Sequence, residues 1–230
     1  MTSKKRLIEA IKNKLIVSCQ ALEDEPLHSP FIMGKMAAAA IEGGAFGIRA
    51  NSIEDIQEIK KVTHCPLIGI IKKVYKKSNV YITPTLLEVE LLHKEGVDII
   101  AMDATNRIRP DGKKITELFP QIRQKYPDQI FMADCSTYKD AKEAYKLGFD
   151  LLGTTLSGYT DETKQTEMPN FELIEQMVND FHVPTIAEGG IWTPRELEKA
   201  FELGAHSAVI GSAITRPQLI TKRFTEVIKK

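Results

Sequence analysis

Residues 66–73 read PLIGIIKK, a short apolar run with a glycine inside it and lysine at its end. A run of this length and composition is typical of a strand that is buried on both faces of a parallel sheet. Side chains alternate along a strand, so Ile68, Ile70 and Lys72 share one face. Burial at the end of that face disfavours the ammonium and lowers the pKa of Lys72, which suits a base near neutral pH. The alternative is a strand-end lysine whose amine simply reaches solvent.

Seven further apolar segments alternate with helical segments along the chain. The expected strands are about 15–21, 45–51, 66–73, 97–104, 129–136, 149–156, 184–191 and 207–214. The expected helices are about 3–13, 31–42, 53–62, 86–94, 115–126, 138–147, 171–181, 194–203 and from 216 or 217 to the C-terminus. Several helices end in glycine just before the next strand, which is a C-cap signal.

This alternation, with polar residues after every strand, predicts an α/β fold of the (β/α)8 TIM-barrel type. Residues 1–230 are expected to form a single domain, with an extra N-terminal helix, because 230 residues is an ordinary length for one barrel. An open doubly wound sheet is the alternative. The stretch after the first strand, LIVSCQALEDEP, contains no glycine and therefore lacks the dinucleotide-binding fingerprint.

Composition restricts the partners and the compartment. The chain has 31 Lys+Arg and 31 Asp+Glu, so no overall field attracts nucleic acid or an anionic membrane. No apolar run approaches the roughly 20 residues that span a bilayer, and the N-terminus lacks the apolar core of a signal peptide. The odd number of cysteines, Cys19, Cys65 and Cys135, has no metal-binding spacing and predicts free thiols. We expect a cytoplasmic protein with no nucleic-acid or membrane partner.

Polar residues are predicted at the ends of most strands, which meet at one mouth in a barrel. These residues are Gln20, Arg49, Lys72, Asp103, Asp134, Thr154 or Thr155, Glu188 and Ser212. Charges that face inward are costly unless they are paired or used, so the set predicts a functional site. For Asp103 and Asp134 the alternative role is only to neutralise Arg49 or Lys72. No histidine ends a strand, so neither a metal site nor another cofactor is expected.

Two glycine-containing stretches, 188–190 and 211–216, follow the seventh and eighth strands. Glycines let backbone N–H groups approach an anion, and a short helix that begins near residue 212 adds its positive end. Barrels often bind phosphate between these two loops, although the alternative is a pair of ordinary tight turns. The expected phosphate ligands are Gly189, Gly190, Gly211, Ser212 and Arg216, with the arginine making a bidentate contact.

The third and seventh strands of an eight-strand ring stand opposite each other, which brings Lys72 and Glu188 to opposite sides of the mouth. This pair suits proton transfer at a carbon acidified by a neighbouring carbonyl. The two groups could act from two faces of a planar intermediate, as inversion at carbon requires. Alternatively, one group moves the C–H proton while the other manages the oxygens or the ring opening.

A set of motifs that spans nearly the whole chain resembles a known family. The motifs are LIVSCQALEDEPLH, GGAFGIRAN, IGIIK, ITPT, MDAT with RIRPDG, MADCST, GFDLLGTTLSGYT, IAEGGI and IGSAITRP. They resemble the N-acylmannosamine-6-phosphate 2-epimerases of sialic-acid catabolism. The resemblance implies an isomerase that is a metal-free barrel, often a homodimer, and interconverts N-acetylmannosamine 6-phosphate and N-acetylglucosamine 6-phosphate. Its small-molecule partner would be a phosphorylated N-acyl amino sugar.

The resemblance also implies roles. Lys72 looks like the acid/base that handles the C2 proton, and Glu188 looks like its catalytic partner. The expected substrate-binding residues are Gln20, Arg49, Asp134 and, as a strand-end hydroxyl, Thr154. In the expected mechanism the sugar opens, loses its C2 proton and forms an enolate, whose oxyanion is held by Arg49 or a backbone N–H.

Three other functions are weighed against this one. A Schiff-base sugar-phosphate aldolase would use Lys72 to attack a carbonyl. Metal-dependent epimerisation is disfavoured because no histidine ends a strand. A regulatory barrel that binds a sugar phosphate without turnover would not need both a base and an opposing carboxylate.

Overall fold

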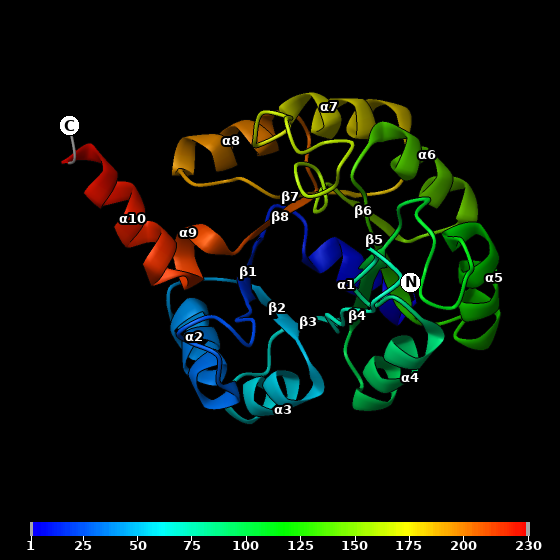
Figure 1. Cartoon of the computed structure of the whole chain (residues 1–230), viewed down its shortest axis with the longest axis horizontal. Coiled ribbons are helices and arrows are strands. Elements are labelled where there is room, and N and C mark those ends of the chain that lie inside the picture. Colours follow the sequence, from blue (N-terminus) through cyan, green and yellow to red (C-terminus); the bar gives the residue numbers. More distant parts are fainter. Residues whose placement is uncertain (1, 229–230) are drawn as a thin grey trace.

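In a computed structural model of the chain, which describes residues 2–228, eight parallel strands close into a barrel. The strands follow one another in chain order around the ring, and β8 pairs with β1 (Figure 1). They are β1 (Leu15–Cys19), β2 (Gly47–Asn51), β3 (Leu67–Ile70), β4 (Ile99–Asp103), β5 (Ile130–Asp134), β6 (Leu151–Gly153), β7 (Thr185–Glu188) and β8 (Ser207–Ile210). The predicted (β/α)8 barrel is confirmed, whereas the single-domain assignment of 1–230 stays a prediction.

The described helices are α1 (Ser3–Ala10), α2 (Pro30–Glu42), α3 (Ile53–Val62), α4 (Leu86–Glu95), α5 (Ile115–Lys125), α6 (Tyr138–Leu147), α7 (Phe171–Asp180), α8 (Pro194–Glu202), α9 (Ser212–Thr215) and α10 (Pro217–Val227). Helices α2 to α8 surround the ring of strands, whereas α1 lies across one end of it (Figure 1). The predicted extra N-terminal helix is α1. No helix among residues 2–228 is both long enough and apolar enough to cross a membrane.

Alternation along the strands divides the core into two layers, as β3 illustrates. Ile68 and Ile70 belong to the cluster inside the barrel, and Leu67 belongs to the layer between the strands and the helices. Gly69 also faces outward, where an added Cβ would lie 2.9 Å from Val97. Glycine at this position therefore lets the segment around α4 pack close to β3. Cys19 and Cys135 are free thiols, as predicted, and they are packed in the outer layer.

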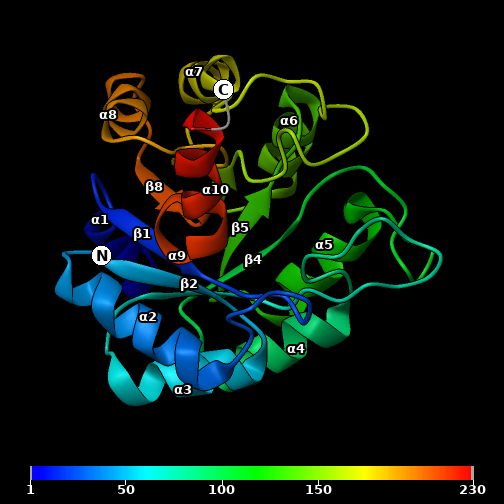
Figure 2. The same ribbon diagram turned by 60° about the vertical axis from the view of Figure 1, so that its left-hand side comes forward.

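The N-terminal end of the barrel is closed by α1 and the turn after it. Leu7, Ile8 and Ile11 pack against the cluster inside the barrel, and Nε2 of His206 lies 2.7 Å from the carbonyl oxygen of Ile8. Figure 2 shows α1 at one end of the strands and the long loops after β3 and β6 at the other end. The N-terminal end of the barrel interior is therefore apolar and covered by α1. Charged side chains that could act on a ligand lie at the opposite, C-terminal mouth.

Several strands are shorter than predicted. β7 ends at Glu188 because Gly189 and Gly190 adopt φ angles of 107° and 72°, which a strand cannot accommodate. β8 ends at Ile210, and four of the residues expected to continue the strand form or begin α9. In both places the backbone turns as it leaves the ring, and an apolar run does not reveal where that turn begins.

An unexpected segment, residues 80–83, lies between β3 and β4 at the mouth. β3 and β4 pair directly at only two positions, Ile68 with Ile99 and Gly69 with Ile100. Beyond them, the N–H of Lys73 donates to the carbonyl oxygen of Tyr81 at 2.8 Å. The N–H of Asp103 donates to the carbonyl oxygen of Ile82 at 3.0 Å. The segment bonds to both strands and therefore places Tyr81 and Ile82 in the mouth.

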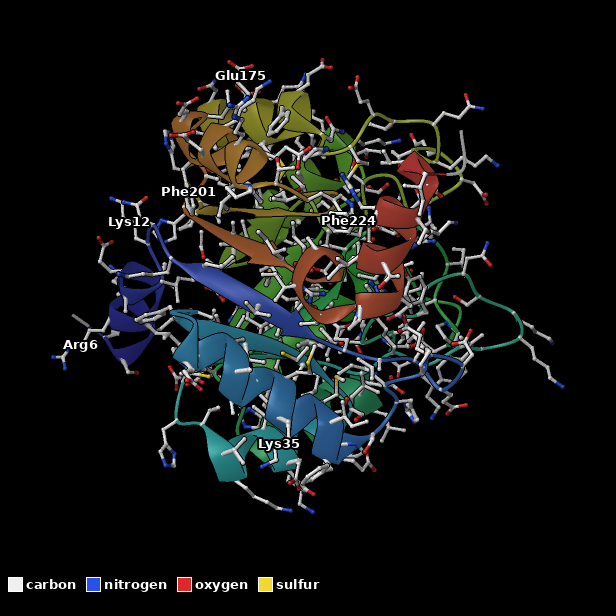
Figure 3. All side chains as sticks on the ribbon, turned by 90° about the vertical axis from the view of Figure 1, so that its left-hand side faces the viewer. Arg6, Lys12, Lys35, Glu175, Phe201 and Phe224 are labelled. Atoms are coloured by element: carbon white, nitrogen blue, oxygen red, sulfur yellow. The ribbon has the colours of Figure 1, made fainter. Side chains whose placement is uncertain are left out.

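The last helix stands apart from the rest of the layer. Figures 1 and 2 show α10 extending away from the ring, and Figure 3 shows Phe224 on it. No described residue of α10 is buried, and the side chains of Phe224, Val227 and Ile228 are 73%, 74% and 81% exposed. This helix has an apolar surface without a partner among the described residues.

Candidate active site

A cavity of about 250 Å³ opens at the C-terminal mouth of the barrel, and we call it the mouth cavity. The predicted site residues that line it are Gln20, Arg49, Lys72, Glu188, Gly189, Gly190, Gly211, Ser212 and Arg216. They lie at the ends of five different strands. The first and the last of them, Gln20 and Arg216, are 196 positions apart in the sequence. Closure of the sheet therefore gathers nearly all of the predicted residues around one space.

Lys72 is half-buried at the end of β3 and presents its amine to the mouth cavity. Its backbone N–H donates to the side-chain oxygen of Asn51 at 2.7 Å, which holds the main chain in place. Nearby Glu188 and Glu25 pair with arginines, so the amine has no ion-pair partner among the described residues. Burial, and then the charges of Arg49 and Arg216, lower the pKa of Lys72 to about 8.

Arg49, fully buried at β2, joins two carboxylates. Its NH2 and NH1 atoms donate to the two carboxylate oxygens of Asp134 at 2.6 and 3.0 Å. NH1 also donates to Oε2 of Glu188 at 2.9 Å. Burial alone lowers the pKa of Arg49, but the two carboxylates outweigh it and the net shift is upward. Asp134 pairs with Arg49, as the alternative role has it, and it does not line the mouth cavity, so its expected contact with a substrate stays a prediction.

Glu188 is in an environment that favours its neutral form. Burial, reinforced by the charge of Asp134, raises the pKa of Glu188 to about 7 although Arg49 opposes the shift. The hydroxyl of Thr155 lies 3.1 Å from Oε2 of Glu188 and 2.7 Å from Oδ1 of Asp134. A carboxyl with this pKa can both give and take a proton near neutral pH.

The strand-end threonine at the mouth cavity is Thr155, and Thr154 is not part of its lining. The hydroxyl of Thr154 donates to the carbonyl oxygen of Glu188 at 2.8 Å and accepts from its N–H at 3.0 Å. Thr154 therefore holds the main chain of Glu188 from behind. β6 ends at Gly153, so alternation could not decide which of the two threonines faces the cavity.

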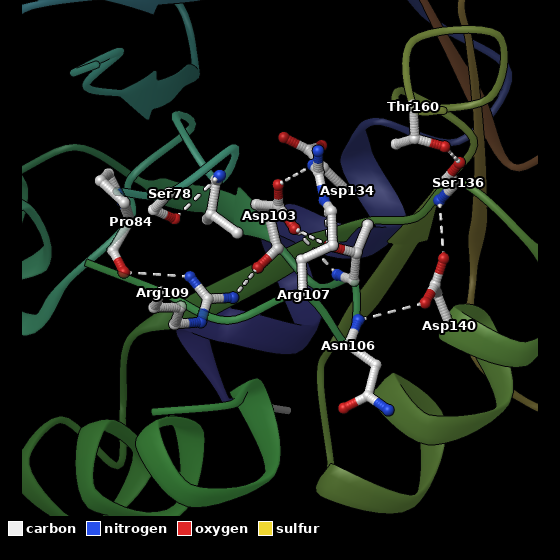
Figure 4. Close-up of polar contacts among 12 residues, drawn as sticks. Ser78, Pro84, Asp103, Asn106, Arg107, Arg109, Asp134, Ser136, Asp140 and Thr160 are labelled. Atoms are coloured by element: carbon white, nitrogen blue, oxygen red, sulfur yellow. Dashed lines mark hydrogen bonds and ion pairs between the residues drawn. The ribbon is translucent and has the colours of Figure 1, made fainter. Parts of the chain in front are cut away.

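Asp103 does not neutralise Arg49 or Lys72, which corrects that alternative. Its Oδ2 pairs with Arg107 at 2.6 Å, and its Oδ1 accepts from the N–H and hydroxyl of Thr105 (Figure 4). The loop after β4 folds back over the end of its own strand, so these partners lie within four residues of Asp103. Asp103 supports this loop and does not line the mouth cavity.

Gln20 is buried beside the mouth cavity with one polar atom unused. Its Nε2 donates to the hydroxyl of Ser18 at 2.6 Å. Its buried Oε1 has no hydrogen-bond partner among the described residues. Such an atom suits an acceptor for a ligand hydroxyl or amide, because an unsatisfied buried oxygen is costly.

The β7 and β8 side of the mouth is rich in exposed backbone. Gly189 and Gly190 have left-handed φ angles, and a Cβ on Gly190 would lie 2.5 Å from the Cβ of Met168. Gly211 precedes α9, whose first residue is Ser212. The missing Cβ at Gly190 makes room for Met168, whereas the phosphate contact expected at these glycines stays a prediction.

Arg216 closes this side together with a residue that the sequence analysis did not select. Its Nε and NH2 lie 2.7 and 2.9 Å from the two carboxylate oxygens of Glu25, which is in the loop after β1. Its NH1 donates to the hydroxyl of Ser212 at 3.2 Å. Although burial alone raises it, the pKa of Glu25 is lowered overall by the N–H of Leu22 and by Arg216. Glu25 could have been found from the predicted barrel, because closure of the ring places the loop after β1 beside the loop after β8.

Sequence reasoning also missed three aromatic residues of the mouth cavity, Tyr81, Tyr159 and Trp192. They lie in the loops after β3, β6 and β7 rather than at strand ends. Among residues 2–228, no group of three His, Cys, Asp or Glu side chains is arranged to hold a metal ion. The titratable side chains that line the mouth cavity, Lys72 and Glu188, can provide acid–base chemistry.

Comparisons with known proteins point to one family. Residues 33–230 match the model of a family described as "Putative N-acetylmannosamine-6-phosphate epimerase". A Clostridioides difficile protein named "Putative N-acetylmannosamine-6-phosphate 2-epimerase" is 56% identical over 223 residues, which are 97% of this chain and 99% of that protein. An Enterobacter protein of the same name is 50% identical over 227 residues, 98% of this chain and 97% of that protein.

Solved structures agree with these matches. The N-acetylmannosamine-6-phosphate 2-epimerase from Clostridium perfringens is 54% identical, with a TM-score of 0.91 over 96% of each chain. Thiamine phosphate pyrophosphorylase from Pyrococcus furiosus is 17% identical, with a TM-score of 0.62 over 97% of this chain and 96% of that one. The second likeness concerns the barrel fold alone.

Proposed function

Because this chain belongs to the N-acetylmannosamine-6-phosphate epimerase family, we propose that it interconverts N-acetylmannosamine 6-phosphate and N-acetylglucosamine 6-phosphate. Membership of this family confirms the resemblance in the motifs and makes the chain an isomerase, as predicted. The proposed reaction is the removal and return of the proton at C2. One observation carries it: an unpaired lysine amine with a pKa of about 8 faces the same cavity as a carboxyl with a pKa of about 7.

Lys72 is the base in the proposed mechanism. In the open-chain sugar the aldehyde at C1 acidifies the C2–H bond. The neutral amine of Lys72 takes the C2 proton and becomes ammonium, while the electron pair of the C–H bond moves to the C1 oxygen as an enolate. A pKa near 8 keeps a useful fraction of this amine neutral at physiological pH. Return of a proton to the opposite face of C2 completes the inversion.

Glu188 is the partner acid/base, and Arg49 organises it. Glu188 shares Arg49 with Asp134, so the carboxyl is held in one orientation toward the cavity. NH1 and NH2 of Arg49 already donate to carboxylates, which favours a positioning role for Arg49 over the expected role of oxyanion holder. Glu188 either protonates the second face of C2 or moves protons among the oxygens.

The substrate's phosphate would bind between the loops after β7 and β8. The exposed backbone around Gly189, Gly190 and Gly211 supports this placement, and Ser212 adds a hydroxyl. Arg216 lines the same end, and because its Nε and NH2 already contact Glu25, NH1 rather than the expected bidentate fork is the group that would meet the phosphate. Gln20 offers a buried acceptor to the sugar.

The finer features of the function are proposals of the same kind. We propose a metal-independent reaction without a cofactor, which the acid–base residues of the mouth cavity support. We also propose a cytoplasmic role in sialic-acid catabolism. A homodimer is proposed as well, supported by the apolar side chains that α10 exposes. Light scattering on the purified protein tests the dimer, which Phe224→Glu should weaken.

Proton NMR of the enzyme with N-acetylmannosamine 6-phosphate in D2O, with a chelator present, tests the proposed function. We expect the gluco epimer to form with deuterium at C2. Loss of conversion with the chelator would overturn metal independence. Cleavage to smaller carbonyl fragments, with trapping by borohydride, would instead identify a Schiff-base aldolase, since an unpaired lysine suits that chemistry too. Binding without exchange would identify a regulatory barrel.

A further inference from the structure

A second cavity, of about 490 Å³, lies beside the mouth cavity, and we call it the side cavity. The two cavities share Tyr81 and Tyr159, which therefore form the boundary between them. The other side-cavity residues used below are Ser78, Asn79, Arg107 and Thr160. The lining also includes the charged Asp161 and Lys164 and the apolar Val74, and the proposed mechanism uses none of these residues.

Tyr81 is held in a fixed position relative to the lysine of the mouth cavity. Ile82, the residue after Tyr81, forms an antiparallel bridge with Lys72, and the carbonyl oxygen of Tyr81 accepts from the N–H of Lys73. The hydroxyl of Tyr81 makes no hydrogen bond to any residue of the described chain. Burial, and then the charges of Asp103 and Asp134, raise the pKa of Tyr81, so this hydroxyl stays protonated and is free to donate.

The proposed function determines which end of the substrate meets Tyr81. The phosphate on C6 would lie between the loops after β7 and β8, while C2 must reach Lys72 on the opposite strand, β3. The nitrogen on C2 then directs its acyl group away from the phosphate. On that side of Lys72 the mouth cavity is bounded by Tyr81, Ile82 and Tyr159.

We propose that Tyr81 donates a hydrogen bond to the carbonyl oxygen of the substrate's N-acyl group and that the acyl chain points into the side cavity. This inference rests on the proposed function, because the orientation of the sugar follows from it. The side cavity gives the end of the acyl chain room beyond Tyr81.

One wall of the side cavity is anchored by the buried Arg109. Its guanidinium donates to the carbonyl oxygen of Pro84 at 3.1 Å and also to that of Asp103 (Figure 4). The hydroxyl of Ser78 donates to the carbonyl oxygen of Ile108 at 2.8 Å. These contacts fasten the loop after β3 to the loop after β4, so Tyr81 does not depend on a ligand for its position.

The opposite wall is anchored by a cluster of three buried hydroxyls. Ser136 lies at 2.6 Å from Thr160 and at 2.8 Å from Thr163, and the two threonines are 2.9 Å apart (Figure 4 shows Ser136 and Thr160). Thr163 also accepts from the N–H of Gly158. The loop that carries Tyr159 is thus tied to the end of β5, and the side cavity is formed before any ligand binds.

Calorimetry with two ligands that share the phosphate tests the hydrogen bond. N-acetylglucosamine 6-phosphate has the N-acyl group, and glucose 6-phosphate has a hydroxyl in its place. We expect Tyr81→Phe to reduce the preference for the acylated ligand by about tenfold, as the loss of one hydrogen bond predicts, with glucose 6-phosphate unchanged. Tyr138→Phe removes a tyrosine hydrogen bond on the outside of the barrel and should change neither. An equal loss of affinity for the two ligands, or unchanged affinity for both, overturns the proposal.

The side cavity is tested by N-hydroxyacetyl- and N-acetylmannosamine 6-phosphate as competing substrates. Asn79→Trp, a substitution at an exposed position of the side cavity, should lower kcat/KM for the larger acyl group and spare N-acetyl. Equal effects on the two substrates overturn the cavity's role. The two failures are distinguishable, because the calorimetric preference can be measured even in a protein that turns over neither substrate.

Discussion

The two sides of the mouth are built in different ways. The side formed by β7 and β8 consists of short contiguous stretches, in which glycines expose the backbone and Arg216 follows within a few residues. The side formed by β3 and β4 needs the inserted segment 80–83, whose hydrogen bonds to both strands bring Tyr81 beside Lys72. An anion site can thus be built from local backbone geometry. A lysine with a lowered pKa also needs a further segment that buries it, here residues 80–83.

The largest expected effect concerns the β3 side. Lys72→Ala should lower the rate of C2 hydrogen exchange by about 10³-fold, because it removes the base. The measurement is deuterium incorporation by NMR, and calorimetry with N-acetylglucosamine 6-phosphate should still detect binding on the β7 and β8 side. Exchange at the wild-type rate would remove Lys72 from the mechanism.

The next effect concerns Arg49, which joins Asp134 of β5 to Glu188 of β7. Arg49→Met leaves Asp134 and Glu188 buried without their cation and should lower the free energy of unfolding by about 3–5 kcal/mol. Urea denaturation at pH 7 measures it. Lys222→Met breaks an exposed ion pair with Glu226 and should cost less than about 1 kcal/mol. Equal stability of the two variants would show that Arg49 does not hold the carboxylates together.

A smaller effect is expected from the β7 and β8 side alone. Arg216→Ala should raise KM roughly 10- to 100-fold with little change in kcat, because it removes phosphate binding common to the ground and transition states. Steady-state kinetics measure both constants. Arg195→Ala, an exposed arginine of α8, should change neither. A fall in kcat alone would assign Arg216 to the chemical step.

The smallest effect is a shift in pH dependence. In the proposed mechanism the neutral amine of Lys72 is the base, so kcat/KM should have a rising limb with increasing pH that is governed by the Lys72 pKa of about 8. The charge of Glu188 raises the pKa of Lys72, so Glu188→Gln should move this limb to lower pH. A pH profile of both proteins checks the direction. If the rising limb of the profile moves to higher pH in Glu188→Gln, then Glu188 does not raise the pKa of Lys72.

Sequence patterns predicted the strand order, the mouth and most of its lining, but they were weakest at the ends of strands. Thr154 and Thr155 are neighbours just beyond a three-residue strand, and only the path of the chain there decides which one faces the cavity. Asp103 and Asp134 occupy equivalent ends of β4 and β5, yet one serves its own loop and the other serves Arg49. Side-chain partners at strand ends depend on loops that carry no periodic signal.

By itself, the sequence determined that this chain forms a barrel with an apolar interior and a charged mouth. Period-2 alternation and helix caps are local properties of the backbone, and they place Lys72 and Arg49 inward without knowledge of the rest of the chain. Tertiary structure alone decided that Arg216 meets Glu25, that Thr154 supports Glu188 from behind, and that Tyr81 stands beside Lys72. These contacts join distant segments, and their geometry follows from closure of the sheet and the packing of loops.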